Sequence, residues 1–452
     1  MKIIVCSAAA LVATLAGSIA GAQTHVPGDA LAGVAALLSS QHADSATAPP
    51  LTLEEAERIV LAVNPEIEVA ARKLAAAQAH VPTAGALDDP MAMVRAWGVP
   101  LAQPWDYNQS QNMLSLTQTF SGAGKRALRA SVAMSDVEVA QAELEQARLA
   151  VRVRAHKAFD DLLRAQDEQK IHDEHVGIAQ QAIAAARIQY ETGKAPQQDL
   201  LKAQVELTRL AEHMIRFEQD AEVARAELNT LMRRDPASPL RVEGAYAVQM
   251  VLPPLDALKE EALQARPDLT AARKAAERSR KEQTLAKKAY TPDFTVSGGY
   301  MLMPPNVSMR NSYMLEGSMN LPWLNKHRHE AEIVESTARA TEQDAELDAL
   351  QNEAFGQIQQ ALVEAEAAQR MAHLYHDELR PQAEATLQSS VIAYGNNKTD
   401  LLNLLDSQMV LIDIDLTWLQ QLADFDSRLA DLEMATGKTL GGTDEQTTGV
   451  KP

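Results

Sequence analysis

The stretch YETGKAPQQDLLKAQ, residues 190–204, decides the fold because residues 394–408, YGNNKTDLLNLLDSQ, are a second version of it. At a displacement of 204 positions the tyrosine, the paired leucines and the final glutamine are identical. The match has no gap and reaches back to the triplet HDE at 172–174, which recurs at 376–378. A unit of about 200 residues is too long for a solenoid repeat. The chain therefore consists of two tandem copies of one domain.

Each copy follows one plan, in which a short helix is followed by two strands and two long helices. Residues 125–190 contain no proline and one glycine, so they can form one helix about 100 Å long at about 1.5 Å per residue. In residues 199–232 apolar side chains recur at spacings of three and four, which is typical of a coiled-coil seam. The first copy, 51–235, has predicted strands near 90–99 and 112–120 and helices over 125–190 and 199–232. The connector is 236–256, and the second copy, 257–437, has predicted strands near 293–302 and 313–321 and helices over 326–394 and 403–436.

The opening helix of the first copy carries two start signals. Thr52-Leu53-Glu54-Glu55 is a capping box, in which the threonine and the glutamate three residues later satisfy free backbone amides. Asn64-Pro65 then restarts the helix after a break, because proline is favoured at a first helical position.

Three of the four predicted strands alternate between apolar and polar residues. In the second segment Leu114, Leu116 and Phe120 face one way, and the serine and threonines between them face the other. In the first segment Arg95 lies between Met93 and Trp97, so its pattern does not show whether the segment is a strand. Nine of the eighteen aromatic residues fall within residues 90–124 and 290–324, as in the aromatic girdles of outer-membrane strands. The nine are Trp97, Trp105, Tyr107, Phe120, Tyr290, Phe294, Tyr300, Tyr313 and Trp323.

The ends of the chain differ from its body. Residues 1–22 have a lysine, an apolar stretch and a final Ala-Gly-Ala, the pattern of a cleavable secretory signal. Residues 23–50 are expected to be flexible and 438–452 to form a disordered tail. The only cysteine, Cys6, lies within the signal, so the exported chain has no thiol for a disulfide or a metal. The net charge of -19 opposes binding to nucleic acid.

Four strands are too few to close a barrel, since even a barrel of about eight strands has an interior just wide enough to be filled by its own side chains. Beyond the signal there is no apolar run long enough for a spanning helix, so strands would have to cross a membrane. Two chains would supply eight strands and a filled interior, whereas three would supply twelve and room for a channel, so a pore favours three chains although the sequence alone does not fix the number. The fold class predicted is mainly α with a small β-barrel portion, in which four transmembrane strands per chain contribute to a barrel of twelve. The duplicated helix hairpins would then form a trimeric α-barrel on the same axis.

The motifs make the chain similar to a known family. Tyr190-x-x-Gly193 is followed by Asp199-Leu200-Leu201-x-Ala203-Gln204, and Tyr394 is followed by Leu404-Leu405-Asp406-Ser407-Gln408. These motifs, with strand-to-helix turns at 122–126 and 324–328, resemble the TolC-like outer-membrane efflux proteins, and within them the heavy-metal efflux subgroup. The resemblance implies a homotrimer in the outer membrane of a Gram-negative-type bacterium that extends through the periplasm. It also implies two partners, a periplasmic adaptor and an inner-membrane pump, and export of heavy-metal cations or drugs.

The resemblance also implies roles for residues at the helical tips. The family meets its adaptor at turns that match Gly193, Lys194, Ala195 and Pro196 in the first copy and Asn396, Asn397 and Lys398 in the second. In the family a tyrosine and an arginine of the second copy bind an aspartate of the first; here Tyr394 and Asp199 match, and Thr399 stands at the arginine position. An acidic ring narrows the family's closed tip, where Asp406 matches one position and Asn403 replaces the other.

Other functions were weighed against this one. A periplasmic coiled-coil scaffold or adaptor without a pore is the main alternative, and a metal-storing periplasmic protein is another. His172 with His175 and His373 with His376 have the i,i+3 spacing that can bind a metal, but solvated helix faces produce such pairs easily, so we predict no resident metal. Half of the sixteen methionines lie within residues 90–124 and 290–324. Thioethers bind Cu(I) or Ag(I), although methionine also fills apolar surface. We find no catalytic pair or cofactor motif, which argues against an enzyme.

Overall fold

The structure is a computed structural model that describes residues 49–440 except 107, 194–195, 249, 306–310 and 397. All the described elements belong to one compact unit, Asp44–Pro452. The predicted signal peptide, nearly all of the segment 23–50 and most of the tail 438–452 lie outside the described residues. The same holds for Tyr107, Lys194, Ala195 and Asn397.

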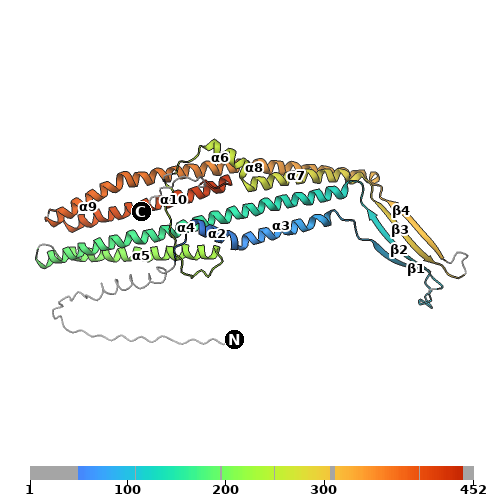
Figure 1. The fold of residues 1–452 in the computed structure, drawn as a ribbon, viewed down its shortest axis with the longest axis horizontal. Coiled ribbons are helices and arrows are strands. Elements are labelled where there is room, and N and C mark those ends of the chain that lie inside the picture. Colours follow the sequence, from blue (N-terminus) through green and yellow to red (C-terminus); the bar gives the residue numbers. More distant parts are fainter. Residues whose placement is uncertain are drawn as a thin grey trace, which may run out of the picture. The chain divides into compact units, whose positions relative to one another are not determined.

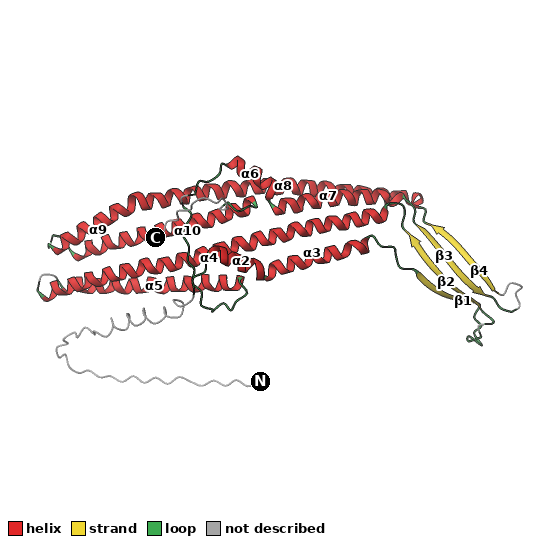
Figure 2. Cartoon of the chain, in the orientation of Figure 1, coloured by secondary structure: helices red, strands yellow, loops and turns green. Residues whose placement is uncertain are grey.

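The described part of the chain repeats one order of elements twice (Figure 1). The first copy contains α2 (Leu53–Val63), α3 (Pro65–Ala84), β1 (Met91–Trp97), β2 (Gln111–Phe120), α4 (Lys125–Glu191) and α5 (Gln197–Leu231). The second contains α6 (Leu255–Ala265), α7 (Pro267–Lys287), η1 (Lys288–Tyr290), β3 (Phe294–Leu302), β4 (Asn311–Met319), η2 (Pro322–Asn325), α8 (Lys326–Leu374), the π-helix η3 (Tyr375–Leu379), α9 (Arg380–Gly395) and α10 (Leu401–Thr436). Figure 2 shows the strands gathered at one end of the helices, with the α4–α5 and α9–α10 turns at the other.

Packing of the helices follows the predicted seams. Helix α4 packs against α3 and α5 of its own copy and against α7 and α10 of the other copy. The face that α5 turns inward is the predicted coiled-coil seam. It includes Ala203, Leu207, Leu210, Met214, Ala221, Ala224, Leu228 and Leu231, all of them buried. Thr52 Oγ1 accepts a hydrogen bond from the amide of Glu55, which is the threonine half of the predicted capping box, and Asn64 caps α3.

The four strands form a single antiparallel sheet in the order β1-β2-β3-β4. Strands β2 and β3 join the two copies, with Leu116 paired to Gly298. The first segment, whose sequence pattern was ambiguous, is a strand, β1. Hydroxyls meet across β2 and β3 on one face, where Thr119 Oγ1 lies 3.2 Å from Thr295 Oγ1. Leu114, Leu116 and Phe120 lie on the opposite face, as the alternation in the sequence predicted.

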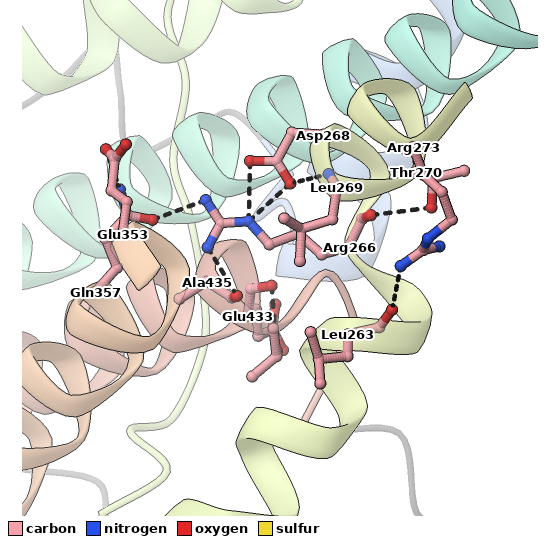
Figure 3. A network of polar contacts seen from close by, with 11 residues as sticks. Leu263, Arg266, Asp268, Leu269, Thr270, Arg273, Glu353, Gln357, Glu433 and Ala435 are labelled. Carbon is pink, nitrogen blue, oxygen red and sulfur yellow. Dashed lines mark hydrogen bonds and ion pairs between the residues drawn. The ribbon is translucent and has the colours of Figure 1, made fainter. Parts of the chain in front are cut away.

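Both copies close with the same contact between their first and last helices. In the first, Asn64 Nδ2 donates to the carbonyl of Leu231 over 3.3 Å. In the second, Arg266 Nη1 donates to the carbonyl of Ala435 over 3.1 Å, and its guanidinium also binds Gln357 and Asp268 (Figure 3). In each case the residue before the helix-starting proline therefore satisfies a carbonyl that the last helical turn would leave free.

Within the range predicted as one long helix, 326–394, the structure has a π-helical segment. Helix α8 ends at Leu374, and the π-helix η3 separates it from α9, with the amide of Arg380 bonded to the carbonyl of Tyr375. Pro381 follows directly and has no amide proton to offer the previous turn, so the regular bonding pattern fails there and a wider turn forms. The matching residue of the first copy is Gly177, and α4 runs through it without a break.

In the part of the chain that the structure describes, none of the helices combines the length and the apolar character needed to span a membrane.

Candidate functional site

The candidate site is the pair of turns that end the long helices. In the first turn Thr192 Oγ1 donates to the carbonyl of Ile188 and caps α4. Gly193 then adopts φ +70, a left-handed conformation that glycine takes without strain. Pro196 precedes α5, and the amide of Asp199 bonds the Pro196 carbonyl, so the carboxylate of Asp199 lies in the first turn of α5.

The second turn reaches the same reversal with different chemistry. Asn396 Nδ2 donates to the carbonyl of Ile392, and the amide of Lys398 donates to that of Ala393. Asp400 caps α10 by accepting a hydrogen bond from the amide of Asn403. Asn396 thus makes the same side-chain bond to its helix end that Thr192 makes in the first copy, and Asp400 supplies an N-cap where the first copy has Pro196.

Two of the predicted gate residues influence each other electrostatically across the copies. Tyr394 of α9 is 6% exposed, and among the described residues its hydroxyl has no hydrogen-bond partner. Burial raises the pKa of Tyr394, and the negative charge of Asp199 raises it further. The carboxylate of Asp199 is therefore within electrostatic reach of the hydroxyl without bonding it. Tyr190, the counterpart of Tyr394, is 41% exposed.

The other predicted gate residues do not join that pair. Thr399 Oγ1 accepts a hydrogen bond from Asn403 Nδ2 over 3.1 Å, so the threonine at the arginine position is bound within its own turn. Asp406 is exposed on α10, as is Asn403.

The two histidine pairs have different surroundings. His172 and His175 are buried between helices, and burial lowers the pKa of His172. His373 and His376 are exposed and lie beside Asp377. Within the described ranges there is no group of three or more His, Cys, Asp or Glu side chains placed to hold a metal ion.

Sequence reasoning missed a buried polar cluster next to the π-helix. Asp415 of α10 forms an ion pair with Arg380, in which Oδ1 lies 2.9 Å from Nε. Its other oxygen, Oδ2, lies 3.4 Å from Nε2 of His175. The guanidinium of Arg380 also lies 5.6 Å from the ring centre of Trp418. The available signal was the acidic Asp415 beside the apolar seam of α10. The cluster connects α4 of the first copy with the start of α9 in the second.

Comparison with known proteins assigns the family. The model of the outer membrane efflux protein family matches residues 58–232 and 258–438. The chain therefore belongs to the outer membrane efflux protein family, which confirms the predicted class and its outer-membrane location.

Individual relatives agree with this family. The chain is 23% identical over 374 residues to the cobalt-zinc-cadmium resistance protein CzcC of Cupriavidus metallidurans, with 82% of this chain and 86% of that protein covered. It is 30% identical over 163 residues to the nickel-cobalt-cadmium resistance protein NccC of Alcaligenes xylosoxydans xylosoxydans, a match that covers 36% of this chain and spans only 37% of that relative. Its fold is similar to that of CusC, with a TM-score of 0.74 at 15% identity over 85% of this chain and 92% of that one.

Proposed function

We propose that three copies of this chain form the outer-membrane duct of a tripartite efflux system, through which substrates pass passively from a pump and an adaptor to the exterior. The observation that carries the proposal is the sheet with two open edges. Strands β1 and β4 each pair on one side only within the described residues. Open edges cannot lie in hydrocarbon, and four strands cannot close on themselves, so the edges of neighbouring chains would complete a ring.

The side chains of the sheet support the same arrangement. Its apolar face is bare in the single chain, which suits contact with lipid. The most exposed members of this face are Val94, Leu114, Leu116, Tyr313 and Leu315. The opposite face carries hydroxyls and would line a wet passage.

Two measurements test the duct. Cross-linking of detergent-extracted protein is expected to give a trimer, and the same protein is expected to conduct ions across a planar lipid bilayer. A protein that is released with the periplasm as a monomer and gives no conductance would show the duct to be wrong and would favour the scaffold.

We propose heavy-metal cations as the substrates. The relatives CzcC and NccC are described as resistance proteins for cobalt, zinc, cadmium and nickel, and the net charge of -19 favours cations near the chain. Deletion of the gene is expected to make the host more sensitive to cadmium or cobalt but not to a neutral drug. Equal sensitivity to both, or to the drug alone, would contradict this substrate class.

We propose that Gly193 to Pro196 and Asn396 to Lys398 meet the adaptor, and that Asp199, Tyr394, Thr399, Asn403 and Asp406 form the closed tip. The proximity of Tyr394 and Asp199 supports this role, because the pair lies between the two copies and opening must separate them. The local bond between Thr399 and Asn403 leaves Tyr394 and Asp199 as the gate residues that influence each other across the copies.

Substitutions at the tip test the gate. Asp199→Ala and Tyr394→Phe are each expected to raise the resting conductance of single channels, because each removes one member of the pair that the proposal places in the closed tip. Tyr190→Phe is the matched control, since Tyr190 has the same sequence position in the first copy but is exposed. Unchanged conductance in both gate variants, or an equal rise in the control, would remove these residues from the gate.

A further inference from the structure

A pair of methionines interrupts the polar face of the sheet. Thr117 Oγ1 lies 2.8 Å from Ser297 Oγ across β2 and β3. Because alternate residues of a strand share a face, the pair two rows further along belongs to this face as well. That pair is Met113 opposite Met301. Two thioethers therefore stand where the pattern of the face predicts hydroxyls.

The neighbouring row adds two further methionines. It runs across the four strands as Met93, Ser115, Gly299 and Met314. Its two central residues are small, and a Cβ on Gly299 would lie only 3.1 Å from Ser115 Cβ, so a larger side chain there would crowd Ser115. Met93 and Met314 thus lie on either side of two small residues, next to the row that contains the methionine pair.

Burial distinguishes these methionines from the apolar side chains of the sheet. Met113 is 5% exposed, and Met93, Met301 and Met314 are half-buried. The lipid-facing side chains of the same strands are bare, with Tyr313 88% exposed. Contact with lipid therefore does not explain why these four of the five strand methionines on the hydroxyl-bearing face are covered, the fifth being Met91, which is 63% exposed.

We propose that Met113 and Met301 form a binding site for a soft monovalent cation, Cu(I) or Ag(I), with Met93 and Met314 as flanking ligands. Directly opposed residues of antiparallel strands have Cβ atoms about 5 Å apart, so two flexible thioether side chains can place their sulfurs on one ion. Thioethers are soft ligands that select such ions over hard ones. Neighbouring thioethers allow the ion to move between weak sites, as passage requires.

Two charged side chains on this face set the affinity. Arg95 is paired with Met113 across β1 and β2, and its guanidinium donates to Met93 Sδ over 3.3 Å and lies 5.2 Å from the ring centre of Trp97. This positive charge opposes a bound cation. Glu316 lies in the row beyond Met314 and has the opposite effect. The site is therefore weak, which suits transit rather than storage.

The inference rests on the proposed duct only in that the hydroxyl face lines the passage. Binding of the ion to the sheet does not require conductance, so the two proposals fail independently. A conducting protein without the site would leave the duct intact, and a non-conducting protein with it would leave the site intact.

The test is equilibrium dialysis of the full chain in detergent against Ag(I) in chloride-free buffer, with bound silver measured by mass spectrometry. Cys6→Ser is introduced into every variant so that a thiol does not bind the probe. The parent protein is expected to bind silver, and Met113→Leu with Met301→Leu is expected to weaken binding by about tenfold or more, about 1.4 kcal/mol. Met319→Leu, on the lipid face of β4, is the matched control and is expected to bind as the parent does.

Further variants keep the result interpretable. Met301→Leu alone keeps the test valid if the double variant does not fold, and Arg95→Gln is expected to tighten binding because it removes the opposing charge. The proposal is overturned if the parent binds no silver, if the Met113 and Met301 variants bind as the parent does, or if Met319→Leu loses as much affinity as they do. It is also overturned if Zn(II) binds at the same residues as tightly as Ag(I).

Discussion

At the scale of single residues, the duplication shows how one backbone requirement is met twice. The chain leaves the last helix of the first copy at Arg233 with φ 56 and that of the second at Gly437 with φ 80. The two positions are 204 apart, so they are the same turn. Left-handed geometry costs a residue with a Cβ about 1 kcal/mol, and the first copy carries that strain because Arg233 is exposed and free of steric conflict.

Arg233→Gly is expected to stabilise the protein by up to about 1 kcal/mol, since glycine removes the strain and loses some of the gain through its more flexible unfolded chain. Urea unfolding in detergent measures the effect. A lower midpoint for this variant would contradict the strain at this turn.

Gly437→Ala is expected to act in the opposite direction. The new Cβ would lie 2.6 Å from the backbone Cα of Arg266, and such overpacking costs about 1–3 kcal/mol or more. It would also displace Arg266 from the carbonyl of Ala435. Urea unfolding in detergent measures this effect as well. A decrease in the free energy of unfolding no larger than that of an ordinary surface substitution would show that the structure relaxes around the new Cβ.

At the scale of elements, the second copy has a π-helix where the first is regular. Pro381 removes one amide from the helix, and the ion pair of Arg380 with Asp415 holds the wider turn against α10. A π-turn is a common site of bending in a long helix. The two hairpins are therefore unequal in stiffness although they are equivalent in fold.

Pro381→Ala is expected to convert residues 375–379 to regular α-helix and to stabilise α8 and α9. Hydrogen exchange is expected to show stronger protection of the amides around Tyr375, and the resting conductance is expected to fall. Gln382→Ala is a neighbouring control. Unchanged exchange in the proline variant would mean that the Arg380–Asp415 ion pair, and not the missing amide, holds the π-turn.

Sequence patterns predicted the elements well where local interactions determine the secondary structure. The seam of α5 and the caps at Thr52 and Asn64 are local and periodic, and they appear as predicted. Strand β1 was undecided because Arg95 lies on the same face as the methionines, which blurs the alternation. The Arg380–Asp415 pair could not be predicted, since it depends on how α9 and α10 of the second copy pack against each other. The proximity of Tyr394 to Asp199 came only from family resemblance.

At the scale of the whole molecule, a group of carboxyls is buried where the two copies meet. Burial raises the pKa of Glu57 to about 7 and that of Asp426 to about 7. It also raises the pKa of Asp160 well above its usual value, with the charge of Asp426 adding to the effect. Each group binds its proton more tightly in the folded chain, so folding is favoured while it is protonated and loses that support as the pH rises through the folded pKa.

The free energy of unfolding is therefore expected to fall as the pH rises from about 5 to about 7.5. His156 partly opposes this change, because burial lowers its pKa to about 4 and the unfolded chain then holds the extra proton. Asp426→Asn is expected to flatten the pH dependence and to raise stability at the upper end, since the amide oxygen still accepts the bond from Ala247. Asp413→Asn, exposed on the same helix, is the control. An unchanged slope in Asp426→Asn would contradict this origin.

The pairing of β2 with β3 has a consequence for how such a ring arose. Within one chain the second strand of the first hairpin meets the first strand of the second hairpin. In the proposed trimer β4 of one chain would meet β1 of the next, which is the same junction between equivalent strands. Six hairpins would therefore occupy six equivalent places in the circle. A ring of six half-length subunits satisfies the same geometry, so gene fusion would have changed the number of chains without changing the circle, and the tip residues were then free to diverge.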